Sequence, residues 1–178
     1  MYNDILHFWF DELTPAQWYK KDDALDAEIK RRFSGVHAQA ASCELFDWRM
    51  AAKGRLAEII ILDQFSRNIF RDTPQAFMND PLALALAQEA LAVGADKAMS
   101  PIERSFLYLP FMHSESAEIH QVAVGLYREL GLAENLDFEI KHKNIIDRFG
   151  RYPHRNAILG RESTPEELEF LQQPGSSF

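Results

Sequence analysis

Two short stretches of the chain place ionisable side chains on helix faces that are otherwise apolar. In residues 62–74 (LDQFSRNIFRDTP), a helical wheel of about 100° per residue puts Asp63 and Arg67 among aliphatic and aromatic side chains. In residues 141–156 (KHKNIIDRFGRYPHRN), the same construction puts His142 on an apolar face. Charges on buried faces cost folding free energy unless they are paired, so these positions need a structural or a functional reason.

Asp63 and Arg67 are four residues apart, a spacing at which two side chains on one helix face can meet. One interpretation is an internal ion pair that fixes the register of the helix. In the other, Arg67 and Asn68 point into a cavity and Asp63 orients the guanidinium group. Arginine suits a carboxylate or phosphate ligand because its planar fork donates two parallel hydrogen bonds.

His113 and His142 are the candidates for acid–base chemistry, because the charge of a histidine changes near neutral pH. His113 follows Pro110, which lacks an N–H and favours a kink. Such a kink can open a pocket, or it can only turn the chain toward residues 114–116. Metal binding is not expected, since His113 and Glu115 are fewer than the three or four ligands that zinc needs. For His142 the alternative is a core histidine bonded to a backbone or carboxylate partner.

The segment 148–156 (RFGRYPHRN) carries several forked donors in a row. Gly150 is expected to end a helix, and the Tyr152-Pro153 pair favours an extended or turn conformation. Its side chains suit either an anion or the unpaired carbonyl groups of helix C-termini. The candidate ligand-binding residues are Asp63, Arg67, Asn68, Arg71, His113, Glu115, His142, Arg148, Arg151, His154, Arg155 and Asn156, of which His113 and His142 are also the catalytic candidates.

The elements that must position these residues are helices, because the apolar periodicity is helical along almost the whole chain. Capping boxes with proline at the first helical position open two of them, at residues 100–103 and 164–167. No run of alternating β-branched residues predicts a strand. The predicted helices span residues 3–12, 15–18, 23–41, 50–71, 80–94, 101–113, 116–130 and 135–149, with a short one after residue 164. We expect an all-α fold of seven to nine antiparallel helices without a sheet, in one domain of residues 1–173 followed by a disordered tail at 174–178.

Length and composition narrow the class of protein. The chain has 178 residues, a net charge of −8 and 47% hydrophobic residues, which is typical of a globular domain and argues against affinity for nucleic acid or anionic membranes. No stretch reaches the roughly 20 apolar residues of a membrane span, and the N-terminus does not resemble a signal peptide, so a cytoplasmic location is expected. The single cysteine, Cys43, excludes an internal disulfide and is expected to be buried or half-buried. The chain contains no P-loop, GxGxxG, HExxH or GxSxG motif, and no cofactor is expected.

Several motifs together resemble those of the bacterial domain-of-unknown-function family 924. They are LDQFSRNIFR (62–71), LPFMHSE (109–115), RFGRYPHRN (148–156) and LGRESTPEE (159–167), with FWF and WYKKD near the N-terminus. The resemblance covers essentially the whole chain. It implies a tetratricopeptide-like, all-helical fold, and it implies no reaction.

Three functions compete on this basis. The first is a module that binds a small anionic ligand or an acidic peptide through the arginines and histidines. The alternative is an enzyme, a hydrolase or lyase acting on a small anionic metabolite. The third is a scaffold whose helix faces bind a protein partner or a second copy of the chain; the oligomeric state is not predicted. Convergence of Asp63, Arg67, His113, His142 and Arg151 on an accessible cavity would favour the first two.

Overall fold

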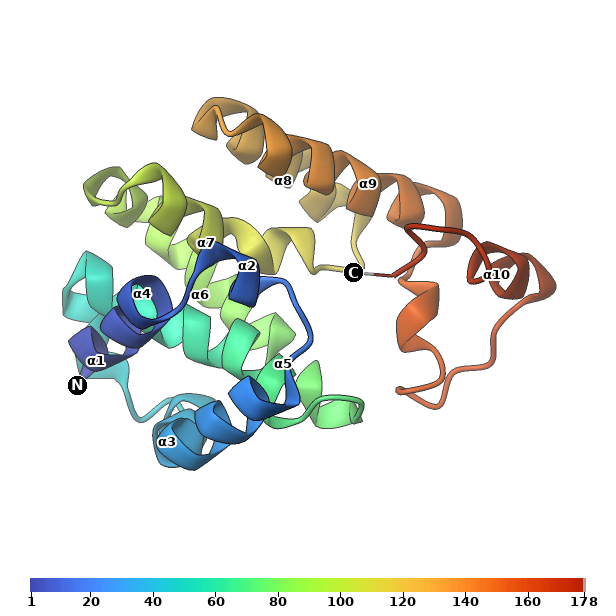
Figure 1. Ribbon diagram of the computed structural model, residues 1–178. Coiled ribbons are helices and arrows are strands. Elements are labelled where there is room, and N and C mark those ends of the chain that lie inside the picture. Colours follow the sequence, from blue (N-terminus) through green and yellow to red (C-terminus); the bar gives the residue numbers. More distant parts are fainter. Residues whose placement is uncertain (178) are drawn as a thin grey trace.

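Helices make up all the regular secondary structure of residues 1–177, the part of the chain that the computed structural model describes (Figure 1). The α-helices are α1 (Tyr2–His7), α2 (Pro15–Trp18), α3 (Asp23–Ala41), α4 (Ala52–Ile60), α5 (Ser66–Ile69), α6 (Asp80–Ala92), α7 (Pro101–Met112), α8 (Ala117–Leu130), α9 (Ala133–Phe149) and α10 (Pro165–Phe170). Two π-helical segments, η1 (Phe8–Glu12) and η3 (Ile61–Phe65), and four 3₁₀ turns, η2 (Phe46–Met50), η4 (Pro74–Ala76), η5 (Ala95–Ala98) and η6 (Pro153–Arg155), complete the list.

The two π-helical segments join neighbouring helices into longer ones. α1 continues through η1, and α4, η3 and α5 form one helix from Ala52 to Ile69. Counted in this way, the described residues form nine α-helical segments, which confirms the predicted all-α class with seven to nine helices and no sheet. The tetratricopeptide-like arrangement stays an expectation from the resemblance.

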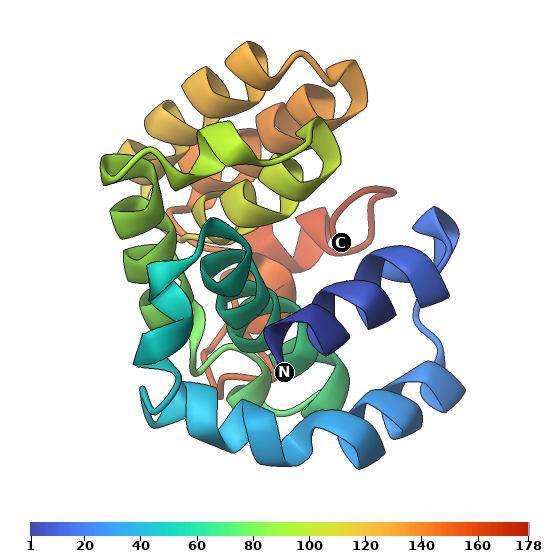
Figure 2. The same ribbon diagram turned by 90° about the vertical axis from the view of Figure 1, so that its left-hand side faces the viewer.

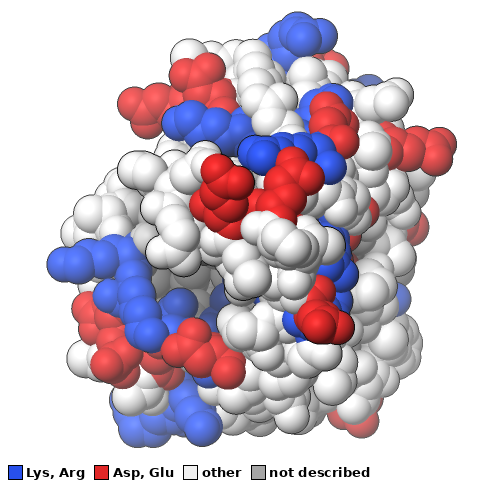
Figure 3. All heavy atoms as spheres, turned by 90° about the vertical axis from the view of Figure 1, so that its right-hand side faces the viewer, with Lys and Arg blue, Asp and Glu red and all other residues white. Residues whose placement is uncertain are grey.

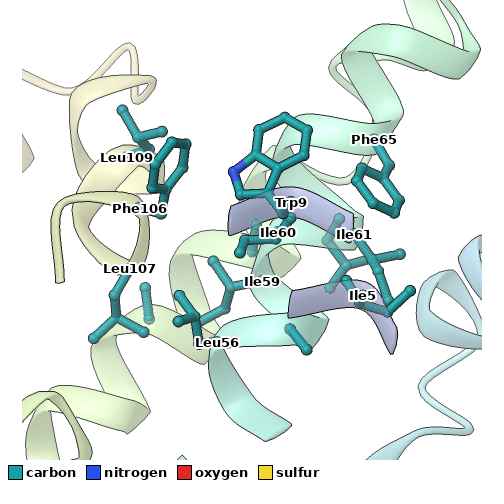
Figure 4. Close-up of a cluster of buried hydrophobic side chains, with 14 of the residues drawn as sticks. Ile5, Trp9, Leu56, Ile59, Ile60, Ile61, Phe65, Phe106, Leu107 and Leu109 are labelled. Carbon is teal, nitrogen blue, oxygen red and sulfur yellow. The ribbon is translucent and has the colours of Figure 1, made fainter. Parts of the chain in front are cut away.

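The continuous helix of α4, η3 and α5 forms the centre of the fold, because it is apolar on all sides. Ile60, Ile61 and Leu62 are fully buried although, as consecutive residues, they point in different directions around its axis. α1, α6 and α7 pack against α4, and α3 packs against η3 and α5. Figure 4 shows the indole of Trp9 between two rings of this core, with centroids 5.7 Å from Phe106 and 5.6 Å from Phe65. Burial of each such side chain stabilises the fold by about 1.5–3 kcal/mol.

The second half of the chain adds helices one after another. α6 packs on α7, α7 on α8, and α8 on α9. Figures 1 and 2 both show α8 and α9 side by side, and the turn between them contains Gly131 with a φ of 79°. α9 ends at Gly150, also left-handed at φ 68°, and the chain then leaves the helix toward η6 and α10. Short connections between successive helices therefore produce the antiparallel neighbours that the sequence predicts.

A close approach between backbones fixes the start of α4. A Cβ atom added to Gly54 would lie 2.1 Å from the carbonyl oxygen of Trp48 in η2. That distance is far below van der Waals contact, so only glycine fits at residue 54 in this packing. The contact places η2, and with it Arg49, against α4, where Arg49 donates two hydrogen bonds to the buried carboxylate of Glu58 at 2.8 and 2.7 Å.

Cys43 and the C-terminal tail are the subject of two further expectations from the sequence. The expectation that Cys43 is buried is wrong, because α3 ends at Ala41 and the thiol lies exposed in the turn that follows, at a φ of 59°. The disordered tail at 174–178 stays a prediction. Ser176 is buried and its hydroxyl donates to the carbonyl of Leu171 at 3.2 Å, while residue 178 lies outside the described residues.

Among residues 1–177, no helix combines the length and apolar character needed to span a bilayer.

Candidate functional site

Asp63 lies in the π-helical segment η3, and its side chain is only 1% exposed. A π-turn changes the i→i−4 hydrogen-bond ladder, and here the carbonyl oxygen of Asp63 accepts from Nη1 of Arg67 at 2.7 Å. The carboxylate of Asp63 accepts from Nε2 of Gln64 at 2.5 Å and lies 3.3 Å from Nη1 of Arg67. The i, i+4 pair predicted from the sequence therefore exists, with the backbone carbonyl as an additional acceptor.

His113 is the second partner of Asp63. It caps the C-terminus of α7, and its Nδ1 lies 2.7 Å from Oδ1 of Asp63. With Asp63 ionised, Nδ1 carries the proton and donates it, which leaves a lone pair on Nε2. No residue in the described part of the chain forms a hydrogen bond with Nε2, and the side chain of His113 is 15% exposed. The pair is thus an imidazole oriented by a carboxylate, with its free nitrogen within reach of solvent.

Burial and neighbouring charges shift the pKa values of Asp63 and His113, and the shifts decide which of the two is charged. Burial acts to raise the pKa of Asp63, but Arg67 and His113 together hold that pKa well below its usual range. Burial, and then the positive charge of Arg67, lower the pKa of His113. Near neutral pH, Asp63 is therefore ionised and His113 is a neutral base.

Asp80 extends the pair into a chain of alternating charges. It begins α6 and accepts two hydrogen bonds from Arg67, at 2.8 and 3.0 Å. The fork of Arg67 and the carboxylate of Asp80 thus form the bidentate pair that arginine favours. Nη1 of Arg155, in η6, lies 3.4 Å from Oδ2 of the same carboxylate. Two arginines therefore share one aspartate.

Arg155 is the least compensated cation of the cluster. Its guanidinium carbon lies 4.7 Å from the ring centre of Phe77 and 4.5 Å from that of Tyr152, so both rings cover it. Its Nε is buried and has no hydrogen-bond partner among the described residues. Burial, followed by repulsion from Arg67, lowers the pKa of Arg155. A buried N–H donor without an acceptor is rare in native proteins and calls for an explanation.

Aromatic and histidine rings close the cluster on its other side. The ring of His142 lies 6.5 Å from that of His113 and 5.7 Å from that of Tyr152, centre to centre. His154 lies 5.5 Å from Tyr152, and its Nδ1 is buried without a partner among the described residues. Contacts link His113 to Asp63, Arg67, Asp80 and Arg155 in turn, and Tyr152 links Arg155 to His142. These residues therefore surround one region of the protein, although they come from six separate segments.

The two additional histidines are neutral near pH 7. Burial lowers the pKa of His142 to about 3, although the carbonyl of Phe138, 2.8 Å from its Nδ1, acts in the opposite direction. Burial, and then Arg155, lower the pKa of His154 to about 4. The contact with Phe138 agrees with the alternative interpretation of His142, a core histidine bonded to a backbone or carboxylate partner, while its role as a site residue stays a prediction.

These values predict a loss of stability in mild acid. The unfolded chain binds a proton at His142 below about pH 6.5, whereas the folded protein does not until about pH 3. Between pH 7.5 and 5.0 this difference lowers the free energy of unfolding by about 2 kcal/mol. Urea titrations at both pH values should therefore show a pH dependence that is about 2 kcal/mol smaller in His142→Gln than in the wild type. A pH dependence in His142→Gln equal to that of the wild type would contradict the assignment.

A second network holds the loop that carries Tyr152. Glu115 accepts from the backbone N–H of Tyr152 at 2.8 Å and from Arg161 at 2.6 and 2.9 Å. The hydroxyl of Tyr152 donates to the carbonyl of Met112 at 2.5 Å and lies 3.1 Å from Nε2 of His120, a fully buried histidine that is itself 2.7 Å from Glu139. The predicted site residue Glu115 thus positions the loop and does not enter the chain of charges.

Five of the predicted site residues have partners elsewhere. Asn68 and Arg71 both donate to Asp26 of α3. Arg148 pairs with Glu166 at 2.8 Å, and Arg151 donates two hydrogen bonds to Glu167. The amide of Asn156 donates to Ser163 at 3.0 Å. The last three residues fasten the C-terminal segment to the end of α9, which leaves Asp63, Arg67, His113, His142, His154 and Arg155 as the candidates that converge.

Asn68 and Arg71 line a separate cavity of about 320 Å³ between α3 and the end of α5. Its walls carry both signs of charge, from Lys21, Lys30, Asp23 and Asp72. Figure 3 shows that the molecule is hollowed on this face, beside a group of positive and negative side chains. The positive and negative charges on the cavity wall balance one another, so the cavity favours neither an anion nor a cation.

Sequence reasoning missed two central residues of the site. Asp80 was predicted only as a helix start, because it precedes a proline, and Phe77 was not singled out. The arginine partners of Asp80 lie 13 and 75 residues away, distances at which no spacing rule of helices operates. The only signal in the sequence was the acidic character of Asp80 itself, which is common at helix N-termini.

The fold and the site together define an all-helical protein with a partly exposed cluster of paired charges and neutral histidines. The model of the family described as "Bacterial protein of unknown function (DUF924)" matches residues 5–175, and the chain belongs to this family. The chain is also similar to a solved structure, that of the protein of unknown function ATU0120 from Agrobacterium tumefaciens. The two are 43% identical, the match covers 96% of each chain, and the TM-score is 0.91. A search of curated proteins found no match.

Proposed function

We propose that the protein binds a small anion, a carboxylate or a phosphate group, at the cluster formed by Arg67, Arg155 and His113. The observation that carries the proposal is the state of Arg155. Among the described residues, this side chain is 8% exposed, shares its one carboxylate partner with Arg67, and keeps a buried Nε–H without a hydrogen-bond acceptor. Burying a cation in this way costs free energy, which an anionic ligand would offset.

Access and ligand size support the same function. The side chains of Arg67 and His113 are 20% and 15% exposed, so a small solute can approach the cluster from solvent. The rings of Phe77 and Tyr152 cover the guanidinium group of Arg155, which leaves little room around it. The surroundings therefore suit an anionic group of a few atoms better than an extended peptide.

The test is direct binding of small anions. Acetate, succinate, sulfate and phosphate would be titrated into the protein by calorimetry and in thermal-shift experiments. We expect at least one of them to bind and to raise the melting temperature of the wild type. Arg155→Gln should weaken that binding by about 10- to 100-fold, because it removes charge-assisted hydrogen bonds of about 1.5–3 kcal/mol.

Arg148→Gln is the matched control, since Arg148 is another arginine of the same segment but pairs with Glu166 on the surface. Its binding should equal that of the wild type. Arg155→Lys, which keeps the charge and removes the fork, should fall between the wild type and Arg155→Gln. If none of the four anions binds the folded wild type, or if Arg155→Gln and Arg148→Gln lose affinity equally, the proposal fails.

A second candidate is an enzyme that acts on the same anion by acid–base chemistry. One observation favours it, the 2.7 Å contact between Asp63 and Nδ1 of His113 with Nε2 left open. Screening of ester and phosphoester substrates would support this candidate if His113→Gln abolished turnover and retained anion binding. Absence of turnover in a protein that binds the anion would leave the binding function alone.

A further inference from the structure

The charged side chains that the described residues bring to the site balance one another. Asp63 and Asp80 are negative, and Arg67 and Arg155 are positive. Among the described residues, the other titratable groups around His113 are His142 of α9, Tyr152 and His154 of the following loop, the Glu115–Arg161 pair and, behind Tyr152, the His120–Glu139 pair. Each pair combines one acidic and one basic group, and His142, His154 and Tyr152 carry no charge near pH 7.

A monoanion beside Arg155 would satisfy the free N–H of that arginine, but it would also give the cluster of described charges a net charge of about −1 in a mostly buried place. Such a charge is costly unless a proton accompanies it. One group is built to accept that proton. Nδ1 of His113 already donates to Asp63, so the imidazolium form would keep this contact as an ion pair, while Nε2 faces no donor or acceptor of the described chain.

His142 and His154 are less suited to accept it. The Nδ1 of His142 is held by a backbone carbonyl and not by a carboxylate. His154 lies next to Arg155 in the chain, and the positive charge of that arginine opposes its protonation. Of these three histidines, only His113 has a carboxylate of a described residue at Nδ1 together with an Nε2 that faces no donor or acceptor of the described chain.

We propose that the site takes up its anion together with one proton, which forms a new N–H bond at Nε2 of His113, and that its ligand is a small monoanion such as a monocarboxylate. This inference rests on the proposed anion-binding function. The proton comes from the solvent or from the acid form of the ligand, and in both cases the bound state contains the imidazolium beside the anion. A dianion would leave the cluster negative even after protonation, so it should bind more weakly than a monoanion.

The experiment is calorimetric titration of acetate into the full chain at pH 6, 7 and 8. Two cationic buffers of different ionisation enthalpy, Tris and triethanolamine, would be compared where both buffer. We expect about one proton taken up per acetate bound and an affinity that falls about tenfold for each pH unit above neutrality. Nitrogen-detected NMR of the histidine rings should show His113 as the Nδ1–H form in the free protein and as the imidazolium in the complex.

His113→Gln should bind acetate without proton uptake and without this pH dependence, whereas a variant of an exposed histidine outside the cluster, His7→Gln, should keep both. The inference is overturned if wild-type protein binds acetate with no proton uptake, or if the uptake persists in His113→Gln. Either result would leave anion binding itself intact. Failure of acetate, succinate, sulfate and phosphate all to bind would instead overturn the proposed function, and this inference with it. If His113→Gln does not fold, the NMR titration of the wild type decides the question.

Discussion

Replacement of Asp63 by alanine should lower the free energy of unfolding by about 3–5 kcal/mol. The carboxylate is 1% exposed and contacts His113, Arg67 and Gln64. Its removal leaves the guanidinium of Arg67 with one carboxylate in place of two and leaves Nδ1 of His113 without an acceptor. Since a domain of this size has a total stability of about 5–15 kcal/mol, the melting temperature should fall by roughly 10 °C, as calorimetry would show.

Asp26→Ala provides the comparison. Asp26 also accepts hydrogen bonds from Asn68 and Arg71 near the end of the same helix, but its side chain and that of Arg71 are 13% and 28% exposed. Water can replace part of these interactions, so the expected loss is about 1–2 kcal/mol. Equal losses in the two variants would show that the Asp63 cluster is not the buried network described above.

Gly54→Ala should destabilise the protein by about 3 kcal/mol, the upper part of the range for overpacked sites. The new Cβ atom would lie 2.1 Å from a backbone oxygen, that of Trp48, so no side-chain rotation can relieve the clash. Either α4 or η2 must move, and the Arg49–Glu58 pair would move with it. Chemical denaturation of the purified variant measures the effect.

The same substitution at Gly35 is a matched control, because this glycine lies within α3 and a Cβ there meets nothing within 4 Å. Alanine has the higher helix propensity, so Gly35→Ala should stabilise the protein by about 0.5–1 kcal/mol. Opposite signs at the two positions would confirm that steric contact and not helix propensity decides the outcome at Gly54. A neutral Gly54→Ala variant would mean that η2 is free to shift.

The sequence predicts the helices well because their information is local. Pro101 and Glu103 in the capping box fix the start of α7, and Gly131 and Gly150 end α8 and α9 at left-handed residues. The break in the helical ladder at Ile61–Phe65 was not predicted, since a π-turn uses the same apolar residues as the α-helix on either side of it. The periodicity of apolar residues predicts the helix, but it does not reveal one wider turn within that helix.

The candidate site could be predicted only in part. The sequence correctly singled out three polar groups on apolar helix faces, namely Asp63, Arg67 and His142. The apolar face of a helix can be recognised from the periodicity of that helix alone. Which arginines meet them depends on how helices from distant parts of the chain pack. Arg151 and Arg155 lie four residues apart with similar surroundings in the sequence, yet Arg151 binds Glu167 and Arg155 reaches Asp80. Only the tertiary structure distinguishes Arg151, which binds the C-terminal segment, from Arg155, whose Nε–H has no acceptor among the described residues.

The wider turn at Ile61–Phe65 has a consequence for how this chain tolerates length changes. A π-turn holds about one residue more than an α-turn, and each residue rotates the helix by about 100°. Deletion of one residue there would turn the wide turn into an ordinary α-turn and leave the residues after it on the same side of the helix. One extra residue in a regular α-helix would instead rotate Arg67 away from Asp80, and Asn68 away from Asp26, by about 100°. The wide turn thus accommodates one residue of additional length without moving the site.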